Sequence, residues 1–416
     1  MNKIYKYVLS LTFLILFLKI FGFFRTLGIA YFFGSNNETD AIFVSISIVM
    51  LFNMIALKSF SEGIIPYLNT NFSKSYFKHK FLLIVGASLI FNIVLFFFSK
   101  LITRLVAPGF EGESVIVAVD SLKIFSFSIL PILLSSLLAA YLSYLKFYNH
   151  AHLGDFVRNI ILIIILFLWH KNVYIISYGW LIGSWLGFFI LLIVFFSKVY
   201  MNLTHSTNRF KLSDSGIFYT VFINVLIYIT VIIDKLFLSF TTSGNIANFT
   251  YADSVRSLIL TTFVIATSRI FLVEFSYNTL KNIKPLINIF VFVTICAVVL
   301  FLFSYKLSEI IYYRGEISLI DIKIISGNLK FIAVSLPFYS MYQILSQKLF
   351  SEKKYWFLIK ALLICVIIKI IICLLSFQKY QLYAVLTSKV VFEILISIII
   401  VMYFIKNKRP KFSICS

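Results

Sequence analysis

The sequence has few acidic residues: it holds 16 Asp and Glu against 37 Lys and Arg, for a formal net charge of +21. Its four cysteines show no CxxC or other paired spacing that would indicate a disulfide framework or a zinc site. It also lacks a Walker P-loop, an HExxH motif and a recognisable hydrolytic triad. These absences argue against a metalloenzyme, an ATPase and a hydrolase, and we expect neither a bound metal nor a cofactor.

Apolar residues dominate what is present. Hydrophobic residues make up 61% of the 416, and 48 residues are Phe. The mean hydropathy is +0.99, whereas soluble domains are only about 45–50% apolar. A soluble fold of this size could not bury so much apolar surface, so the chain is a membrane protein. We therefore assign its positive charge to topology and to contacts with anionic lipids, and not to nucleic acid.

Segments long enough to cross a bilayer, at about 20 residues each, recur along the whole chain. The sequence therefore predicts an all-α polytopic membrane protein with about twelve transmembrane helices. The predicted segments lie near 8–33, 40–66, 80–103, 118–146, 153–170, 173–199, 215–240, 247–275, 284–305, 324–349, 356–377 and 381–405.

Basic residues are concentrated in alternate connections and at the termini. The opposite connections are shorter or mixed: GSNNET has no Lys or Arg, and PGFEGES is acidic. Because basic residues mark the cytoplasmic side, we expect both termini in the cytoplasm. The residues that carry this pattern are Lys74, Lys78, Lys80, Lys146, Arg209, Lys211, Lys281, Lys284, Lys353, Lys354, Lys406, Lys408, Arg409 and Lys411.

The chain repeats itself once. After the third and the ninth segment comes a turn with Gly and Glu, then a Leu-Lys pair, then a proline seven or eight residues later, Pro131 and Pro337. Two halves that start on the same side of the membrane imply parallel repeats, related by an axis along the membrane normal. We expect two six-helix bundles, 1–205 and 206–416, around a central cavity.

Charged residues occur inside the apolar segments at matching places in the two halves. Lys19 and Arg25 lie in the first segment, and Asp234 and Lys235 lie in the seventh. A charge near the bilayer centre costs about 2.5–3.5 kcal/mol on insertion scales, so such residues usually face a water-filled cavity or a partner. This pattern favours a transporter of a polar or charged substrate.

Several short motifs are similar to those of the MviN/MurJ family of lipid II flippases, within the multidrug/oligosaccharidyl-lipid/polysaccharide exporter superfamily. The stretch LKIFGFFRTLGIAYFFGSNNETDAIFV resembles the family's opening motif, with Lys19 and Arg25 at its basic positions and Asp40 at its aspartate. The family's A-P-G-F is intact at residues 107–110, and its Y-A-D is present at 251–253. The resemblance runs from about residue 5 to residue 405.

The resemblance implies a function. Members of this family are transporters, not enzymes, and move an undecaprenyl-pyrophosphate-linked glycan from the inner to the outer leaflet of the bacterial cytoplasmic membrane by alternating access. The expected partners are this lipid-linked glycan and membrane lipids, and we expect a monomer. A Wzx-like flippase for a lipid-linked O-antigen or capsule unit is the alternative. A membrane glycosyltransferase or polymerase is disfavoured because the loops are short.

Four basic residues are the predicted substrate-binding set: Lys19, Arg25, Lys58 and Arg256. Arginine offers a planar fork of donors to phosphate oxygens, and lysine a mobile point charge. The family has adjacent arginines in its second helix, where this chain has only Lys58 nearby, and Arg256 lies two positions beyond the family's basic position. Lys58, near a helix end, can equally be a base that extends to the membrane surface.

Four acidic residues are predicted to be gates or structural elements. Asp40 and Asp253 are expected at the starts of two matching helices, where each either caps its helix or gates the cavity by pairing with an arginine. Glu62 is one turn from Lys58 and can pair with it.

Asp234 is the fourth of these acids. In some relatives a sodium ion is held by side-chain oxygens of the seventh, eleventh and twelfth helices. Here the eleventh segment offers Lys369 instead of Asn or Asp. We expect Asp234 to pair with Lys235 or Lys369, and we expect no sodium site.

Overall fold

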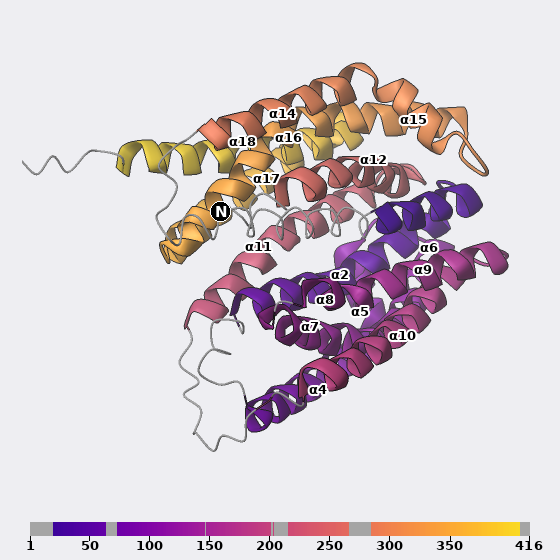
Figure 1. The fold of residues 1–416 in the computed structure, drawn as a ribbon. Coiled ribbons are helices and arrows are strands. Elements are labelled where there is room, and N and C mark those ends of the chain that lie inside the picture. The colour runs from indigo at the N-terminus through magenta and orange to yellow at the C-terminus, as the bar shows by residue number, and fades with distance from the viewer. Residues whose placement is uncertain are drawn as a thin grey trace, which may run out of the picture.

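The computed structural model describes residues 20–63, 73–145, 147–200, 203, 215–265 and 284–407, nearly all of which are helical (Figure 1). The first helix is Ile20–Phe33. The N-terminal group continues with α2 (Asn37–Gly63), α4 (Lys74–Phe97), α5 (Ser99–Val106), α6 (Glu113–Ser126), α7 (Ile129–Tyr144), α8 (Tyr148–Ala151), α9 (Leu153–Leu168) and α10 (Ile175–Lys198). The C-terminal group comprises α11 (Ser215–Leu238), α12 (Asn245–Ile259), the π-helical η2 (Leu260–Ile265), α14 (Lys284–Leu302), α15 (Ser304–Tyr312), α16 (Leu319–Ser351), α17 (Tyr355–Tyr380) and α18 (Leu382–Asn407).

Several of these helices are long and apolar enough to cross a bilayer. Within the described ranges, five qualify by length and composition, and up to seven if each of two bent helix pairs is counted as one span. The protein is thus an all-helical membrane protein with several spans. The five are Lys74–Phe97, Ile175–Lys198, Phe218–Leu238, Tyr355–Tyr380 and Leu382–Lys406.

The two bent pairs differ from the straight segments that the sequence predicts. The α6–α7 pair bends by 44° and replaces one predicted span at 118–146. The break lies just before Pro131, whose ring nitrogen cannot donate to the preceding turn. The α14–α15 pair bends by 77°. In contrast α16 runs without interruption through Pro337, so the two repeated prolines have different local effects.

Close packing of α9 against α10 depends on glycine. Gly183 and Gly187 of α10 face the backbone of α9: an added Cβ would lie 2.8 Å from the carbonyl oxygen of Arg158 and 2.5 Å from that of Gly154, respectively. Small residues four apart let two membrane helices approach closely. This approach fixes Arg158 beside the residues of α10.

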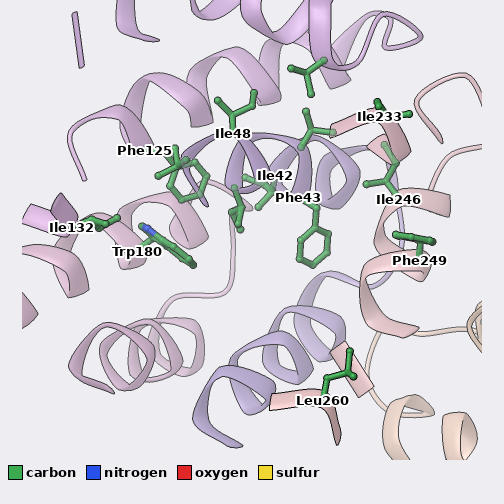
Figure 2. Packing of buried hydrophobic residues seen from close by; sticks show 14 of the residues in the cluster. Ile42, Phe43, Ile48, Phe125, Ile132, Trp180, Ile233, Ile246, Phe249 and Leu260 are labelled. Atoms are coloured by element: carbon green, nitrogen blue, oxygen red, sulfur yellow. The ribbon is translucent and has the colours of Figure 1, made fainter. Parts of the chain in front are cut away.

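Helix α2 lies at the centre of the molecule. Ile42 and Phe43 are buried, and Figure 2 shows α2 between Phe125 and Trp180 on one side and Ile233 on the other. Helices α11 and α12 of the C-terminal group both pack on α2. The apolar core is therefore continuous between the two groups, and α2 is the element against which they meet (Figure 1).

Candidate functional site

The N-terminal group contains a polar cluster around Trp180. Arg25 of the first helix donates from Nη1 to Asn159 Oδ1 at 3.0 Å, and Arg158 of α9 donates from Nη2 to Asp155 Oδ1 at 2.5 Å. The guanidinium carbons of Arg25 and Arg158 lie 4.9 and 4.8 Å from the centre of the Trp180 ring. Both distances fall within the range of a cation–π contact. We call these five residues the N-terminal cluster.

Neighbouring helix contacts hold Arg25 in place. The first helix runs alongside α9, because Phe21 packs on Phe156 with ring centres 5.1 Å apart and Phe32 packs on Phe167 at 5.2 Å. Arg25 lies between these two contacts along the helix. Its side chain is partly buried, and its Nε is buried without a hydrogen-bond acceptor among the described residues.

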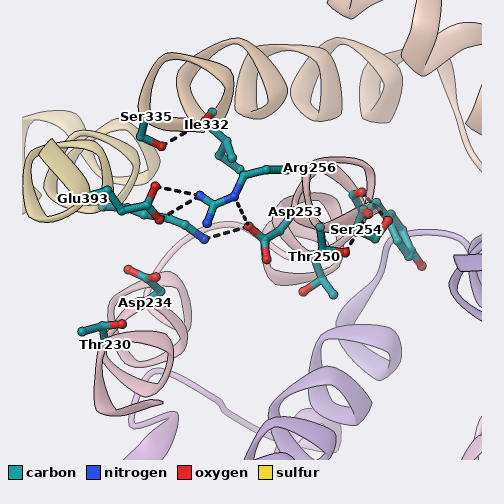
Figure 3. A network of polar contacts seen from close by, with 12 residues as sticks. Thr230, Asp234, Thr250, Asp253, Ser254, Arg256, Ile332, Ser335 and Glu393 are labelled. Carbon is teal, nitrogen blue, oxygen red and sulfur yellow. Dashed lines mark hydrogen bonds and ion pairs between the residues drawn. The ribbon is translucent and has the colours of Figure 1, made fainter. Parts of the chain in front are cut away.

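The C-terminal group contains a separate ionic network of four residues (Figure 3). Arg256 of α12 binds both carboxylate oxygens of Glu393 of α18, at 2.8 and 3.0 Å. Asp253 lies 3.7 Å from Arg256 Nε and 2.9 Å from Lys389 Nζ. We call Asp253, Arg256, Lys389 and Glu393 the C-terminal network. It joins α12 to α18 and contains two cations and two carboxylates.

A second buried ion pair lies next to this network, between α11 and α17. Lys369 Nζ is 2.6 Å from Asp234 Oδ1 and donates to the Thr230 carbonyl oxygen at 2.9 Å. Both side chains are almost fully buried. Of the two partners predicted for Asp234, Lys369 is the one that pairs with it, while Lys235 donates to Thr250 Oγ1 at 2.5 Å.

An ammonium group occupies the position beside Asp234, where a bound cation would need further oxygen ligands. Within the described part of the chain, no three His, Cys, Asp or Glu residues form a group that could hold a metal ion.

Asp40 does not cap its own helix. Asn36 does so: its Oδ1 accepts from the Thr39 backbone N–H at 2.9 Å. The two carboxylate oxygens of Asp40 instead accept from the backbone N–H groups of Gly244 and Ala247, at 2.8 and 2.7 Å. These donors belong to the first turn of α12, so Asp40 caps a helix of the opposite group.

Further hydrogen bonds join the two groups around Asp40. The Tyr251 hydroxyl donates to the Gly34 carbonyl at 2.7 Å, and Ser35 Oγ donates to Asn248 Oδ1 at 2.6 Å. The Glu316 backbone N–H donates to the Tyr31 carbonyl at 3.0 Å. We call this contact, of residues 31–40 with residues 244–251 and 315–321, the junction.

Glycine allows the backbones to meet at the junction. Gly34, Gly244 and Gly315 all have positive φ, at 62°, 84° and 63°. A Cβ on Gly34 would lie 2.7 Å from the Glu316 carbonyl oxygen, and one on Gly244 would lie 2.7 Å from that of Ser35. Both the backbone conformation and the close approach therefore require glycine here.

The other predicted site residues have different outcomes. Lys19 lies outside the described residues, and so do the side chains of Lys58 and Glu62 in α2. Asp253 is not a helix cap as predicted, because α12 begins at Asn245, two turns earlier, and Asp253 binds Lys389.

Arg256 is buried and paired. Glu393 holds it in a bidentate contact, so Arg256 does not present an unpaired guanidinium to a ligand in this conformation.

Sequence reasoning missed Arg158, Lys389 and Glu393. All three lie within predicted apolar segments. Because burying a charge in a membrane is unfavourable, a search of every segment for charged residues would have identified them. Trp180 gave no such signal, since an aromatic residue in an apolar helix is ordinary.

The chain is similar to known proteins over most of its length. The family model described as "Lipid II flippase MurJ" matches residues 29–414. The probable lipid II flippase MurJ of Buchnera aphidicola subsp. Schizaphis graminum is 27% identical over 380 residues, which cover 84% of this chain and 73% of the relative. The corresponding protein of Aquifex aeolicus is 27% identical over 364 residues, which cover 82% and 70%.

Solved structures give the same result. A lipid II flippase MurJ in an inward closed conformation superposes with a TM-score of 0.83 at 25% identity, covering 95% of this chain and 87% of that one. An inward-facing multidrug resistance MATE family transporter of the MOP superfamily shares the fold, with a TM-score of 0.72 at 16% identity over 96% of this chain and 97% of that one. The chain therefore belongs to the lipid II flippase MurJ family, whose members are membrane transporters and not enzymes.

Proposed function

We propose that this chain translocates lipid II, an undecaprenyl-pyrophosphate-linked peptidoglycan precursor, from the inner to the outer leaflet of the bacterial cytoplasmic membrane. The observation that carries the proposal is the family match over residues 29–414. The relatives named above are described as probable lipid II flippases.

The N-terminal cluster supports this substrate chemically. A diphosphate crosses hydrocarbon only if cations accompany it, and guanidinium groups suit phosphate oxygens because they donate as a fork. Arg25 has a buried Nε that lacks an acceptor among the described residues. Lys19 and Lys58 are proposed to add charge along the path. Arg256 is proposed to contribute only secondarily, in a state in which it leaves Glu393.

Translocation is proposed to follow alternating access between two six-helix repeats, 1–205 and 206–416, which enclose a central cavity in a twelve-helix monomer with both termini in the cytoplasm. In that topology the junction lies at the outer ends of the helices. Its hydrogen bonds then form the outer gate, and they must break for the substrate to leave. The fold similarity to an inward closed flippase supports this assignment.

The test is complementation of a bacterial strain depleted of its own lipid II flippase. We expect the wild-type chain to restore growth at normal cell shape, with membrane levels checked by immunoblot. Failure to rescue at equal membrane levels, together with rescue of a strain that lacks an O-antigen flippase, would replace lipid II with another lipid-linked glycan as the substrate.

A further inference from the structure

The N-terminal cluster contains more positive charge than its own residues neutralise. Arg25 and Arg158 lie near the same Trp180 ring, at 4.9 and 4.8 Å. Asp155 binds Arg158, and no carboxylate among the described residues forms an ion pair with Arg25. The cluster thus holds two guanidinium groups and one carboxylate, in a place where a charge is costly without a counter-ion.

Both arginines also keep unused donors. The Nε atoms of Arg25 and Arg158 are buried and have no hydrogen-bond acceptor among the described residues. Arg158 as a whole is only 6% exposed. Buried donors are normally satisfied, so this arrangement suits an acceptor that arrives from outside the chain.

A small polar cavity adjoins Arg158. Its volume of about 20 Å³ has room for roughly one water molecule. A diphosphate does not fit there while Asp155 binds Arg158, so Asp155 occupies the position of an anion. The polar residues that line the cavity are Asn53, Ser135, Ser136, Asp155, Arg158 and Ser184.

We propose that Arg158 is a second phosphate ligand for the translocated lipid, acting with Arg25 beside Trp180, and that Asp155 is an internal anion that the substrate displaces. This inference rests on the proposed function, because it assigns a further residue to the same substrate. Two guanidinium groups on separate helices match the two phosphate groups of a diphosphate better than the single group of a monophosphate. The site therefore selects a diphosphate over a monophosphate.

The experiment measures binding of undecaprenyl diphosphate and of undecaprenyl monophosphate to the full-length protein in nanodiscs. We expect Arg158→Gln to weaken diphosphate binding about tenfold or more, as loss of a charge-assisted hydrogen bond does. The same variant should show a smaller preference for the diphosphate over the monophosphate. Arg158→Lys should recover part of the affinity. Asp155→Asn should tighten binding several-fold, because it removes the competing carboxylate.

Arg104→Gln is the matched control, because Arg104 is an exposed arginine of α5, and it should bind as the wild type does. If Arg158 and Asp155 only brace the helices, Asp155→Asn lowers thermal stability without tightening binding. That result, or an unchanged affinity in a folded Arg158→Gln or Arg158→Lys variant, overturns the inference and leaves the proposed function intact. A wild-type protein that binds neither lipid overturns the proposed function as well.

Discussion

The N-terminal cluster and the C-terminal network contain similar side chains but differ in how their charges are compensated. In the network, two cations meet two carboxylates, and Arg256 is held by both oxygens of Glu393. In the cluster, Asp155 binds Arg158, whereas Arg25 donates to the neutral Asn159. A buried charge that is paired within the protein needs no ligand, whereas an uncompensated one favours binding of an anion.

The comparison separates two roles that sequence reasoning had joined. It had placed Arg25 and Arg256 in one substrate-binding set. The structure gives Arg256 a bidentate partner on α18, which makes it a link between helices α12 and α18. Of the two, Arg25 is the one that can meet an anion without first breaking an ion pair.

The largest stability effect is expected from breaking the C-terminal network. Glu393→Gln removes one partner of a buried pair and leaves Arg256 with only the more distant Asp253. Such a loss costs about 3–5 kcal/mol. Thermal unfolding of the purified protein should show a clearly lower Tm, and the double variant Arg256→Gln/Glu393→Gln should recover much of it.

The exposed pair of Lys306 and Glu309, 2.9 Å apart on α15, provides the control. Glu309→Gln should leave the Tm unchanged, because exposed ion pairs contribute little. If Glu393→Gln melts at the same temperature as this control, the network is not a structural link and the comparison fails.

A smaller effect is expected at the junction. Asp40→Ala removes both acceptors from the first turn of α12, and loss of a helix cap costs about 0.5–2 kcal/mol. The open state should become about two- to thirtyfold more populated. Maleimide labelling of Ser35→Cys, in a protein without its native cysteines, should accelerate accordingly. An unchanged labelling rate would show that Asp40 does not hold the two groups together.

No effect is expected from removing sodium. The Lys369 ammonium already lies 2.6 Å from Asp234 Oδ1, so it takes the place that a bound cation would need. Lipid II flipping in vesicles should proceed equally in sodium and in choline at the same ionic strength. A collapse of the rate in choline would mean that Asp234 binds sodium in another conformation.

Most helices could be predicted from the sequence, because long apolar runs in a membrane protein have few alternatives to helix. The predicted segments 153–170 and 173–199 correspond closely to α9 and α10. The bends at α6–α7 and α14–α15 were not predicted, because apolar content alone does not show where a helix changes direction.

The site was less predictable. The charge of Arg25 identified it within an apolar segment, and the same reasoning paired Asp234 with either Lys235 or Lys369. The partners of Asp40 and Arg256 lie more than one hundred residues away, and one sequence does not show which distant helices meet. The cap that Asp40 provides to α12 also depends on backbone donors, which carry no residue-type signal.

The most direct measurement is the rate of lipid II flipping in proteoliposomes that contain Arg25→Ala, with the Arg256→Gln/Glu393→Gln double variant reconstituted at the same level. If Arg25 is the available phosphate ligand, Arg25→Ala flips no faster than protein-free liposomes. Arg25→Lys then keeps part of the rate, because the charge survives while the fork is lost. The double variant, which removes a pair and leaves no buried charge unmatched, keeps measurable flipping. Wild-type flipping by Arg25→Ala, or complete loss in a folded double variant, would contradict the account.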